Sequence, residues 1–449
     1  MTLLISLGLT LVSHIFAYMA ALYLFSAVVE PLRIVVIAWI STSAFLMWIA
    51  YNIMPVRIGE NLQLRVKVMM GGRMLIHTSL ISLLLNNLLY WAFAAGSFWP
   101  SLPVWVRVAD GGVAALAVLF PMFNGGLRVL CLSRRLRILR RVLVLCACWF
   151  PLFGAIAFLY LARIAHDEYQ YALYKKGLYE RRAKTALCKT RYPIVMLHGA
   201  ALREAKFFRY WGRIPRELER NGADVYYGDQ QAWGTVENNA REVKRMVEEV
   251  MERTGCEKVN IVAYSKGGLD ARYMISSLGM GDKVASLTTI ASPHRGCEIV
   301  DLAQHMPSSV YAFFGKLANK YTVLFGDARP EFDVASRQFA TEYVKRFNYE
   351  NPDVAGVYYQ SYAALMRFFF SDGLMMIPYI IVYFLRGPND GLVDVESAQW
   401  GDFQGIISTE GWRGVSHSDL IDFKREDYYG FDVAEAYVGI VSSLRERGF

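Results

Sequence analysis

Long apolar stretches without a charged residue occupy the first third of the chain. A bilayer requires a helix of about 20 mainly apolar residues to cross its hydrocarbon core. We therefore predict a multi-pass transmembrane domain of about five helices over residues 1–163. The fourth span is the weakest, because it is short and contains Pro121 and a Gly-Gly pair. The five charge-free windows are 1–29, 34–56, 74–106, 111–127 and 142–162.

The pattern changes at Pro193, where short apolar strands begin to alternate with amphipathic helices. Strands that are apolar along their whole length are typical of a parallel sheet with helices on both faces. We therefore predict an α/β domain over residues 193–449, with functional residues at the carboxyl ends of its strands. The predicted strands are 193–197, 223–228, 258–264, 284–291 and 356–363, and the predicted helices are 235–254, 266–278 and 433–445.

A charged and aromatic segment, residues 164–192, joins these two regions. Its mixture of Lys, Arg and Tyr favours an amphipathic linker helix that lies among lipid headgroups. A plain solvated connector is the alternative.

The distribution of charge supports a membrane protein. The chain of 449 residues has a net charge of +8 and a mean hydropathy of +0.24. Residues 1–163 hold 13 Lys or Arg and 3 Asp or Glu, whereas the remaining residues hold 35 and 37. Excess positive charge confined to the most apolar region is typical of loops that flank membrane helices, so we expect no nucleic-acid partner. The six Cys show no metal-binding spacing.

Two basic loops, residues 57–73 and 134–141, suggest the orientation in the membrane. Basic loops stay in the cytoplasm. With five spans both loops share that side, and we expect residues 193–449 to lie outside the cytoplasmic membrane. The basic residues in 163–182 argue for the opposite side, and a fourth window that does not span would also keep the domain in the cytoplasm.

Ser265 is the candidate nucleophile. It lies between a predicted strand and a predicted helix in the sequence Ala-Tyr-Ser-Lys-Gly-Gly, residues 263–268. This arrangement is a nucleophile elbow with Ala in place of the first Gly. The sharp turn requires small residues two positions before and after the Ser, and Ala263 and Gly267 meet that requirement. The alternative is a Ser in an ordinary turn between strand and helix.

Two backbone N–H groups are needed to stabilise the oxyanion of a tetrahedral intermediate. Lys266, directly after the candidate nucleophile, provides one of them. Ala200, in the loop after the first predicted strand, provides the other. The His198-Gly199 pair before it could also be a simple turn.

In a nucleophile-elbow hydrolase the acid and then the base follow the Ser along the chain. His417, in a loop near the end of the chain, is the candidate base, and a surface-loop histidine is the alternative. Asp390, in the turn of residues 386–393, is the candidate acid, unless it only shapes that turn with Gly391. Asp394 and Glu396 are the substitutes.

Five motifs in this order resemble the bacterial triacylglycerol lipases of the α/β-hydrolase superfamily: AYSKGGLDARY, TTIASPHRG, FNYENPDVAGVYYQSYA, GPNDGLV and VSHSD. The resemblance covers residues 193–449 and implies the same triad and the same oxyanion residues. It also implies a helical lid at about residues 297–352. A further apolar run, 367–385, could pass for a sixth span, but the candidate acid Asp390 that follows it argues that the run packs over the active site or dips into the membrane interface.

The resemblance also suggests a structural calcium ion. An Asp two residues after the catalytic His, here Asp419, resembles a calcium ligand in some of these lipases. Asp372, 18 residues before Asp390, would provide the second carboxylate. The alternatives are that Asp372 caps a helix that starts near Gly373 and that Asp419 makes a loop hydrogen bond.

These observations predict a membrane-bound carboxylic ester hydrolase whose chemistry requires no cofactor. Its expected partners are membrane lipids and a lipid or long-chain ester substrate. Two alternatives remain: an acyltransferase with the same triad, and a catalytically silent membrane scaffold or receptor.

Overall fold

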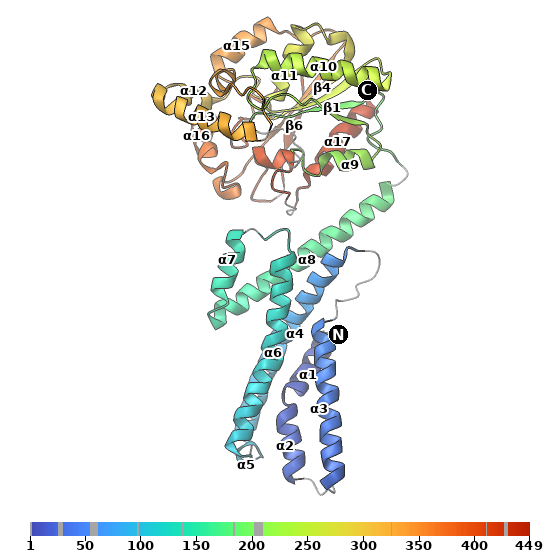
Figure 1. Ribbon diagram of the computed structural model, residues 1–449, viewed down its shortest axis with the longest axis vertical. Coiled ribbons are helices and arrows are strands. Elements are labelled where there is room, and N and C mark those ends of the chain that lie inside the picture. The colour runs from blue at the N-terminus through green and yellow to red at the C-terminus, as the bar shows by residue number, and fades with distance from the viewer. Residues whose placement is uncertain are drawn as a thin grey trace. The chain divides into compact units, whose positions relative to one another are not determined.

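The computed structural model divides into two compact units, Met1–Glu180 and Arg181–Phe449, which we call the helical unit and the α/β unit. Figure 1 colours both along the chain. The structure describes residues 2–25, 30–53, 62–96, 98–136, 138–182, 185–201, 210–324, 326–409, 411–425 and 430–449.

The helical unit contains eight helices within its described residues. They are α1 (Thr2–Ser13), α2 (Ile15–Phe25), α3 (Glu30–Ile53), α4 (Leu64–Ala95), α5 (Phe98–Ser101), α6 (Val104–Leu132), α7 (Ile138–Ala147) and α8 (Pro151–Arg182). Among the described residues, α3, α4 and α6 are long and apolar enough to cross a membrane. The pair α1 and α2, bent by 46° at their junction, could form a fourth span.

The three or four candidate spans among the described residues differ from the five that the sequence predicts. The window 142–162 does not form one helix: α7 ends at Ala147 and α8 begins at Pro151. Proline lacks the backbone N–H needed within a helix but is well suited to a first turn, which explains the break. In contrast, the window 111–127 lies inside α6, which contains Pro121 and extends beyond the window at both ends.

The segment 164–192 is not a separate linker helix in the structure. α8 runs without a break from Pro151 to Arg182 and so joins the fifth window to most of that segment. Its Glu168 accepts hydrogen bonds from Arg65 at 2.6 Å, from the Ser133 hydroxyl at 2.6 Å and from the Arg134 backbone N–H at 3.0 Å. The beginning of α4, the end of α6 and the middle of α8 are thereby held together.

α4 and α6 approach each other closely at two glycines. A Cβ on Gly72 would lie 2.7 Å from the carbonyl oxygen of Gly125, and a Cβ on Gly125 would lie 2.5 Å from that of Gly72. Small residues at such a crossing let two helix backbones pack without intervening side chains. Around it lies a buried apolar cluster that includes Met69, Val129 and Phe158.

A buried Asp–His pair joins α6 to the junction of α1 and α2. Asp110 Oδ2 lies 2.7 Å from His14 Nδ1, and both side chains are fully buried. Asp110 Oδ1 accepts the backbone N–H of Ala17 at 3.1 Å. The helix break at His14 leaves the first N–H groups of α2 without partners in their own helix, and a carboxylate satisfies such groups well.

The α/β unit is built on a six-stranded sheet in the order β2-β1-β3-β4-β5-β6, in which every neighbouring pair is parallel. The predicted parallel α/β fold is thus confirmed. β6 is an addition to the predicted strands. The strands are β1 (Ile194–Leu197), β2 (Val225–Tyr227), β3 (Val259–Tyr264), β4 (Val284–Ile290), β5 (Tyr358–Ala364) and β6 (Asp402–Ile407).

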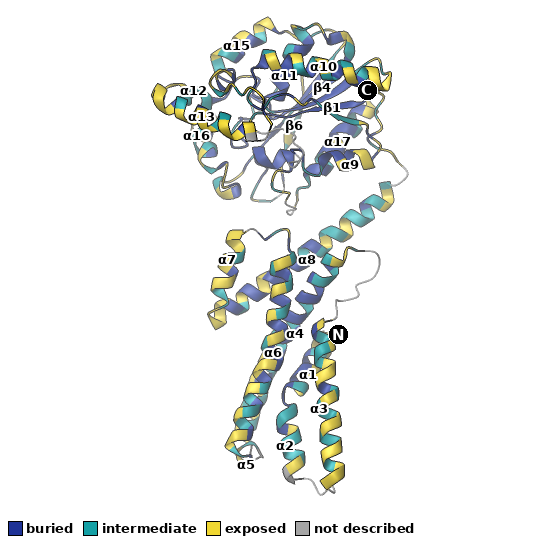
Figure 2. Cartoon of the chain, in the orientation of Figure 1, coloured by how far each residue is buried: buried dark blue, intermediate teal, exposed yellow. Residues whose placement is uncertain are grey.

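Helices cover both faces of this sheet, because alternate strand residues point to opposite sides. On one face Val262 and Ile290 pack in a cluster with α9 (Ile214–Arg220) and α17 (Val433–Glu446). On the other face Ile261 and Leu287 pack with α10 (Val236–Thr254) and α11 (Gly267–Ser276). The central strands β3 and β4 are buried along their whole length and are dark blue in Figure 2.

Between β4 and β5 the chain forms four helices: α12 (Glu298–Gln304), α13 (Ser308–Leu324), α14 (Phe332–Arg337) and α15 (Thr341–Glu350). They fall within the predicted lid, residues 297–352. α13 exposes Phe313, Phe314 and Leu317, and it is largely yellow in Figure 2. The apolar run 367–385 contains α16 (Met376–Arg386). Short 3₁₀ helices lie at Gly281–Lys283, Phe369–Ser371 and His417–Ile421.

Candidate active site

Ser265 occupies a strained turn between β3 and α11. Its φ of 52° lies in the left-handed region, which is rare for a residue with a Cβ and is often found at functional sites. The turn is possible only with small neighbours. A Cβ on Gly267 would lie 2.7 Å from the carbonyl oxygen of His198, and one on Gly268 would lie 2.3 Å from Ser292 Oγ.

A chain of hydrogen bonds links Ser265 to the predicted base and acid. His417 Nε2 lies 3.1 Å from Ser265 Oγ, and His417 Nδ1 lies 2.7 Å from Asp390 Oδ2. The other carboxylate oxygen of Asp390 accepts the backbone N–H groups of Leu392 and Val393 at 3.0 and 2.9 Å. Asp390 is fully buried and His417 nearly so. The carboxylate thus favours a proton on Nδ1 and leaves Nε2 to accept one from the serine.

The two substitute acids lie elsewhere. Asp394 Oδ1 accepts the backbone N–H groups of Glu396 and Ser397 at 3.0 and 2.9 Å and so shapes its own turn. No hydrogen bond joins Asp394 or Glu396 to His417 among the described residues. Of the three carboxylates considered, the structure brings only Asp390 to the histidine.

The loop after β1 carries Ala200 to the nucleophile. A Cβ on Gly199 would lie 2.9 Å from Ser265 Cβ, so the two backbones are almost in contact. The Tyr210 hydroxyl accepts the N–H of Gly199 at 2.9 Å, and His198 Nε2 lies 2.7 Å from the carbonyl oxygen of Gln230. These contacts fix the loop on both sides of Gly199.

Lys266 follows Ser265 directly, and its side chain is turned into α11. Its ammonium group is buried and paired with Asp270 at 2.6 Å, one turn along α11. The side chain is therefore occupied within the helix that follows the nucleophile. Neither Ala200 nor Lys266 has a recorded acceptor for its backbone N–H within the described part of the chain.

Two tyrosines that sequence reasoning did not find support the site. Tyr264 donates its hydroxyl hydrogen to the His417 carbonyl oxygen at 2.8 Å, which ties the base loop to β3. Tyr210 holds Gly199, as described above. Burial raises the pKa of both phenols, so both stay protonated as neutral hydrogen-bonding groups. The only sequence signal for Tyr264 is its position next to Ser265.

Ser265 and His417 line an apolar cavity of about 280 Å³. The predicted lid contributes Cys297, Val300 and Phe339 to its wall. Burial raises the pKa of the Cys297 thiol to about 12, so this cysteine is not a competing nucleophile. The apolar lining suits a hydrocarbon chain placed beside the serine. The full lining is Ala200, Ala201, Tyr210, Trp233, Tyr264, Ser265, Pro293, Cys297, Ile299, Val300, Phe339, Leu374, Met375, Leu392, Val393, His417, Ser418, Ile421 and Phe423.

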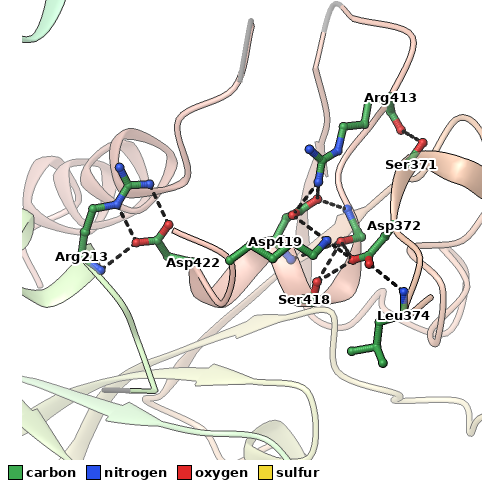
Figure 3. A network of polar contacts seen from close by, with 10 residues as sticks. Arg213, Ser371, Asp372, Leu374, Arg413, Ser418, Asp419 and Asp422 are labelled. Carbon is green, nitrogen blue, oxygen red and sulfur yellow. Dashed lines mark hydrogen bonds and ion pairs between the residues drawn. The ribbon is translucent and has the colours of Figure 1, made fainter. Parts of the chain in front are cut away.

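The two predicted calcium ligands do lie close together, but the residues around them do not fit a calcium site. The ammonium group of Lys424 contacts Asp372 and lies 3.3 Å from Asp419 Oδ1. Figure 3 shows this network. No group of three or more His, Cys, Asp or Glu suited to a metal occurs among the residues that the structure describes. Calcium takes six to eight oxygen ligands, and here a lysine stands between its two expected carboxylates.

The alternatives considered for these carboxylates are partly correct. Asp419 makes a loop hydrogen bond, with Oδ2 accepting the Ser416 N–H at 3.0 Å. Asp372 Oδ1 accepts the N–H of Leu374 at 3.1 Å, but α16 begins only at Met376. Burial acts to raise the pKa of Asp372, but the charge of Lys424 and the hydrogen bonds from Lys424, Ser416 and Ser418 lower it to about 2.

Comparison with known proteins identifies the family of the α/β unit. Residues 192–366 match the family of the alpha/beta hydrolase fold. A triacylglycerol lipase of Vibrio cholerae is 31% identical over 238 residues, which cover 47% of this chain and 75% of that protein. The chain belongs to the α/β-hydrolase lipase family. It is a carboxylic ester hydrolase.

Two further proteins extend the comparison. Triacylglycerol lipase 2 of Saccharomyces cerevisiae is 27% identical over 262 residues, covering 54% of this chain and 74% of that protein. The mature form of Bacillus licheniformis lipase BlEst2 aligns at 19% identity with a TM-score of 0.43, covering 56% of this chain and 91% of that chain. The family match leaves the helical unit of this lipase-family protein outside it.

Proposed function

We propose that this protein is a membrane-bound serine hydrolase that cleaves carboxylic esters of lipids with the triad Ser265, His417 and Asp390. The observation that carries the proposal is the unbroken chain of hydrogen bonds from Asp390 through His417 to Ser265, which ends at an apolar cavity. The strained backbone of Ser265 adds independent support. A silent scaffold would have no need to maintain this geometry.

In the proposed reaction Ser265 Oγ attacks the carbonyl carbon of the ester while His417 Nε2 takes its proton. The C–O bond to the alcohol then breaks, and His417 returns the proton to the leaving alkoxide. A water molecule, deprotonated by the same nitrogen, attacks the acyl-enzyme and releases the carboxylic acid and free Ser265. Asp390 stabilises the imidazolium that forms at each stage.

The backbone N–H groups of Ala200 and Lys266 would stabilise the oxyanion. Ala200 lies beside the nucleophile and lines the cavity, and Lys266 follows Ser265 directly. Removing one oxyanion donor costs about 3–4 kcal/mol in the transition state of other serine hydrolases. The lining of the cavity, in which only a few side chains are polar, favours a long acyl chain as the group that is held.

The position of α8 leads us to propose that the α/β unit lies on the cytoplasmic side. The chain leaves α6 near Ser133. At Glu168 it has returned to the same end of α6, because the side chains of Ser133 and Glu168 are hydrogen-bonded. Between these points α7 and the first half of α8 share a buried apolar cluster with the last part of α6, and the ring centres of Phe158 and Phe123 are 5.4 Å apart. The window 142–162 would therefore enter the membrane as a hairpin and leave on the same side.

This topology agrees with the basic residues. With α1 and α2 together, α3, α4 and α6 as four spans, the start of α4 and the end of α6 share one side. Arg65, Lys67, Arg134 and Arg135 then all lie on the cytoplasmic side, as the positive-inside rule favours. The same rule with five spans leads to the opposite placement, and the break at 148–150 supports the four-span proposal.

Replacement of the nucleophile tests the proposed chemistry. The purified full-length protein should hydrolyse nitrophenyl esters, and Ser265→Ala should lower kcat on the order of 10⁶-fold. The matched control is Ser276→Ala, at the far end of α11, which should behave as wild type. If Ser265→Ala and wild type hydrolyse the esters at equal rates, the triad assignment is wrong. Products that contain an added alcohol instead of water would identify acyl transfer.

Cysteine labelling tests the proposed side of the membrane. Arg447→Cys places a thiol near the exposed end of α17, and its labelling is measured as the increase over the native cysteines. An impermeant maleimide should label it only after cell lysis. Labelling of intact cells or spheroplasts would place the α/β unit outside and restore the five-span interpretation.

A further inference from the structure

We propose that Lys424 is a positioning residue that holds the loop of His417 with a tethered ammonium group, where a metal ion would otherwise be expected. Its Nζ contacts Asp372 Oδ2 and lies 3.3 Å from Asp419 Oδ1. The side chains of Asp372 and Asp419 are 1% and 4% exposed, and that of Lys424 is 15% exposed. The cation therefore joins two buried carboxylates from separate segments of the chain.

Both carboxylates hold the immediate neighbours of His417. Asp372 Oδ2 accepts the hydroxyl groups of Ser416 and Ser418, each at 2.6 Å. Asp419 Oδ2 accepts the backbone N–H of Ser416 at 3.0 Å. Because Ser416 and Ser418 flank the histidine, movement of either carboxylate would move the imidazole relative to Ser265.

The described charges of this cluster balance without a metal. Among the residues that the structure describes, Asp372 and Asp419 face Lys424 and Arg413, and Arg413 lies 3.0 Å from Asp419 Oδ1. A divalent ion added to this set would leave an excess of positive charge in a buried place, which is costly. It would also need the oxygen positions that Lys424 already contacts.

The turn that carries Lys424 is itself anchored. Asp422, two residues earlier, has a φ of 55° and accepts hydrogen bonds from Arg213 Nε and Nη2, both at 2.7 Å. Figure 3 shows this ion pair beside the Asp372 and Asp419 cluster. The ammonium group is thus presented by a fixed backbone and remains in place at any concentration of free metal.

Chelation and substitution together test this proposal. The measurements of activity rest on the proposed function. In the full-length protein, excess EDTA should leave the Tm and kcat of wild type unchanged, and added Ca²⁺ should have no effect. Lys424→Met removes the charge with little change in shape. It should lower kcat on the order of 10- to 100-fold, because small displacements of a catalytic group are costly. KM for a short ester should change little.

Three further variants separate positioning from general stability. Lys424→Arg should retain most of the activity, because it restores a cation. Lys424→Ala should lose activity and regain part of it with millimolar Ca²⁺, since the ammonium group no longer occupies the position between the two carboxylates. The matched control Lys283→Met removes a lysine from an exposed ion pair with Glu248 and should match wild type.

The proposal is wrong if chelation lowers the activity and the Tm of wild type. It is also wrong if Lys424→Met has the same kcat and Tm as wild type. If Lys424→Met does not fold, the wild-type chelation result and the behaviour of Lys424→Arg still decide. Failure of the proposed function gives a different result from failure of this proposal. Ser265→Ala would then keep full activity, whereas substitution of Lys424 would still change the Tm.

Discussion

The two units of the molecule each bury an aspartate–histidine pair with the same geometry. His14 Nδ1 lies 2.7 Å from Asp110 Oδ2 in the helical unit, and His417 Nδ1 lies 2.7 Å from Asp390 Oδ2 in the α/β unit. In both pairs the second carboxylate oxygen accepts backbone N–H groups. The interaction between carboxylate and imidazole is therefore no sign of catalysis by itself.

The difference lies at the other nitrogen of each ring. His417 Nε2 faces Ser265 Oγ at the wall of a cavity. His14 Nε2 is buried and has no hydrogen-bond partner among the described residues. In the proposed reaction one pair passes a proton to a reacting group, whereas the other joins three helices: α1 with its continuation α2, and α6. The surroundings of the ring decide whether the same pair serves chemistry or packing.

The largest expected effect is the difference in kcat between variants of Asp390 and variants of Asp110. Asp390→Asn should lower kcat about 10⁴-fold, because an amide favours the wrong histidine tautomer without removing the packing. Asp110→Asn should leave kcat unchanged in molecules that remain folded. Ester hydrolysis by equal amounts of monomeric protein in detergent measures both. A comparable loss of kcat in Asp110→Asn would contradict the separation between the units.

The second prediction concerns stability. Asp110→Ala leaves His14, Tyr90 and the Ala17 N–H without their shared acceptor, so it should destabilise the helical unit by about 3–5 kcal/mol. Thermal unfolding in detergent measures this loss. Replacing both members of the pair, as His14→Leu with Asp110→Leu, should restore only part of the stability, because Tyr90 and the Ala17 N–H still lack their acceptor. A double variant as unstable as Asp110→Ala would mean that the pair does more than fill space.

A third buried carboxylate allows a test by pH. The pKa of Asp372 is lowered from 3.8 to about 2 in the folded protein. The charged form is therefore favoured by folding, and its stabilisation is present above pH 4 and lost as the pH falls towards 2. At about 1.4 kcal/mol per pKa unit the contribution is about 2.5 kcal/mol. The unfolding free energies of wild type and Asp372→Asn should differ most above pH 4 and converge below it. A constant difference would exclude this titration.

The smallest expected effect concerns the packing of α4 on α6. Gly125→Ala places a methyl group 2.5 Å from the Gly72 carbonyl oxygen and should cost about 1–3 kcal/mol. Gly112→Ala is the matched control on the same helix, because nothing lies within 4 Å of its added Cβ. Thermal unfolding should show a lower Tm for Gly125→Ala only. Activity at low temperature should be the same in both variants.

The sequence by itself determined the features that depend on neighbours along the chain. Apolar strands alternating with amphipathic helices predict the parallel sheet, because the hydrophobic period differs between strand and helix. The small residues around Ser265 predict the sharp turn, because a larger side chain at Gly267 would meet the backbone of the first strand. The order of Ser265, Asp390 and His417 then limits the choice of acid and base.

The tertiary structure alone decided the features that depend on partners far apart in sequence. Asp390 and His417 are 27 residues apart, Asp372 and Lys424 are 52 apart, and His14 and Asp110 are 96 apart. The sequence favours Asp390 over Asp394 and Glu396 by its place in the turn, and the tertiary structure brings only Asp390 of these three to His417. Lys424 contacts Asp372, one of the two expected calcium ligands, because the turn at Asp422 directs the lysine side chain towards it. Local patterns fix dihedral angles, whereas the choice of a partner for a buried charge depends on which segments the whole fold brings together.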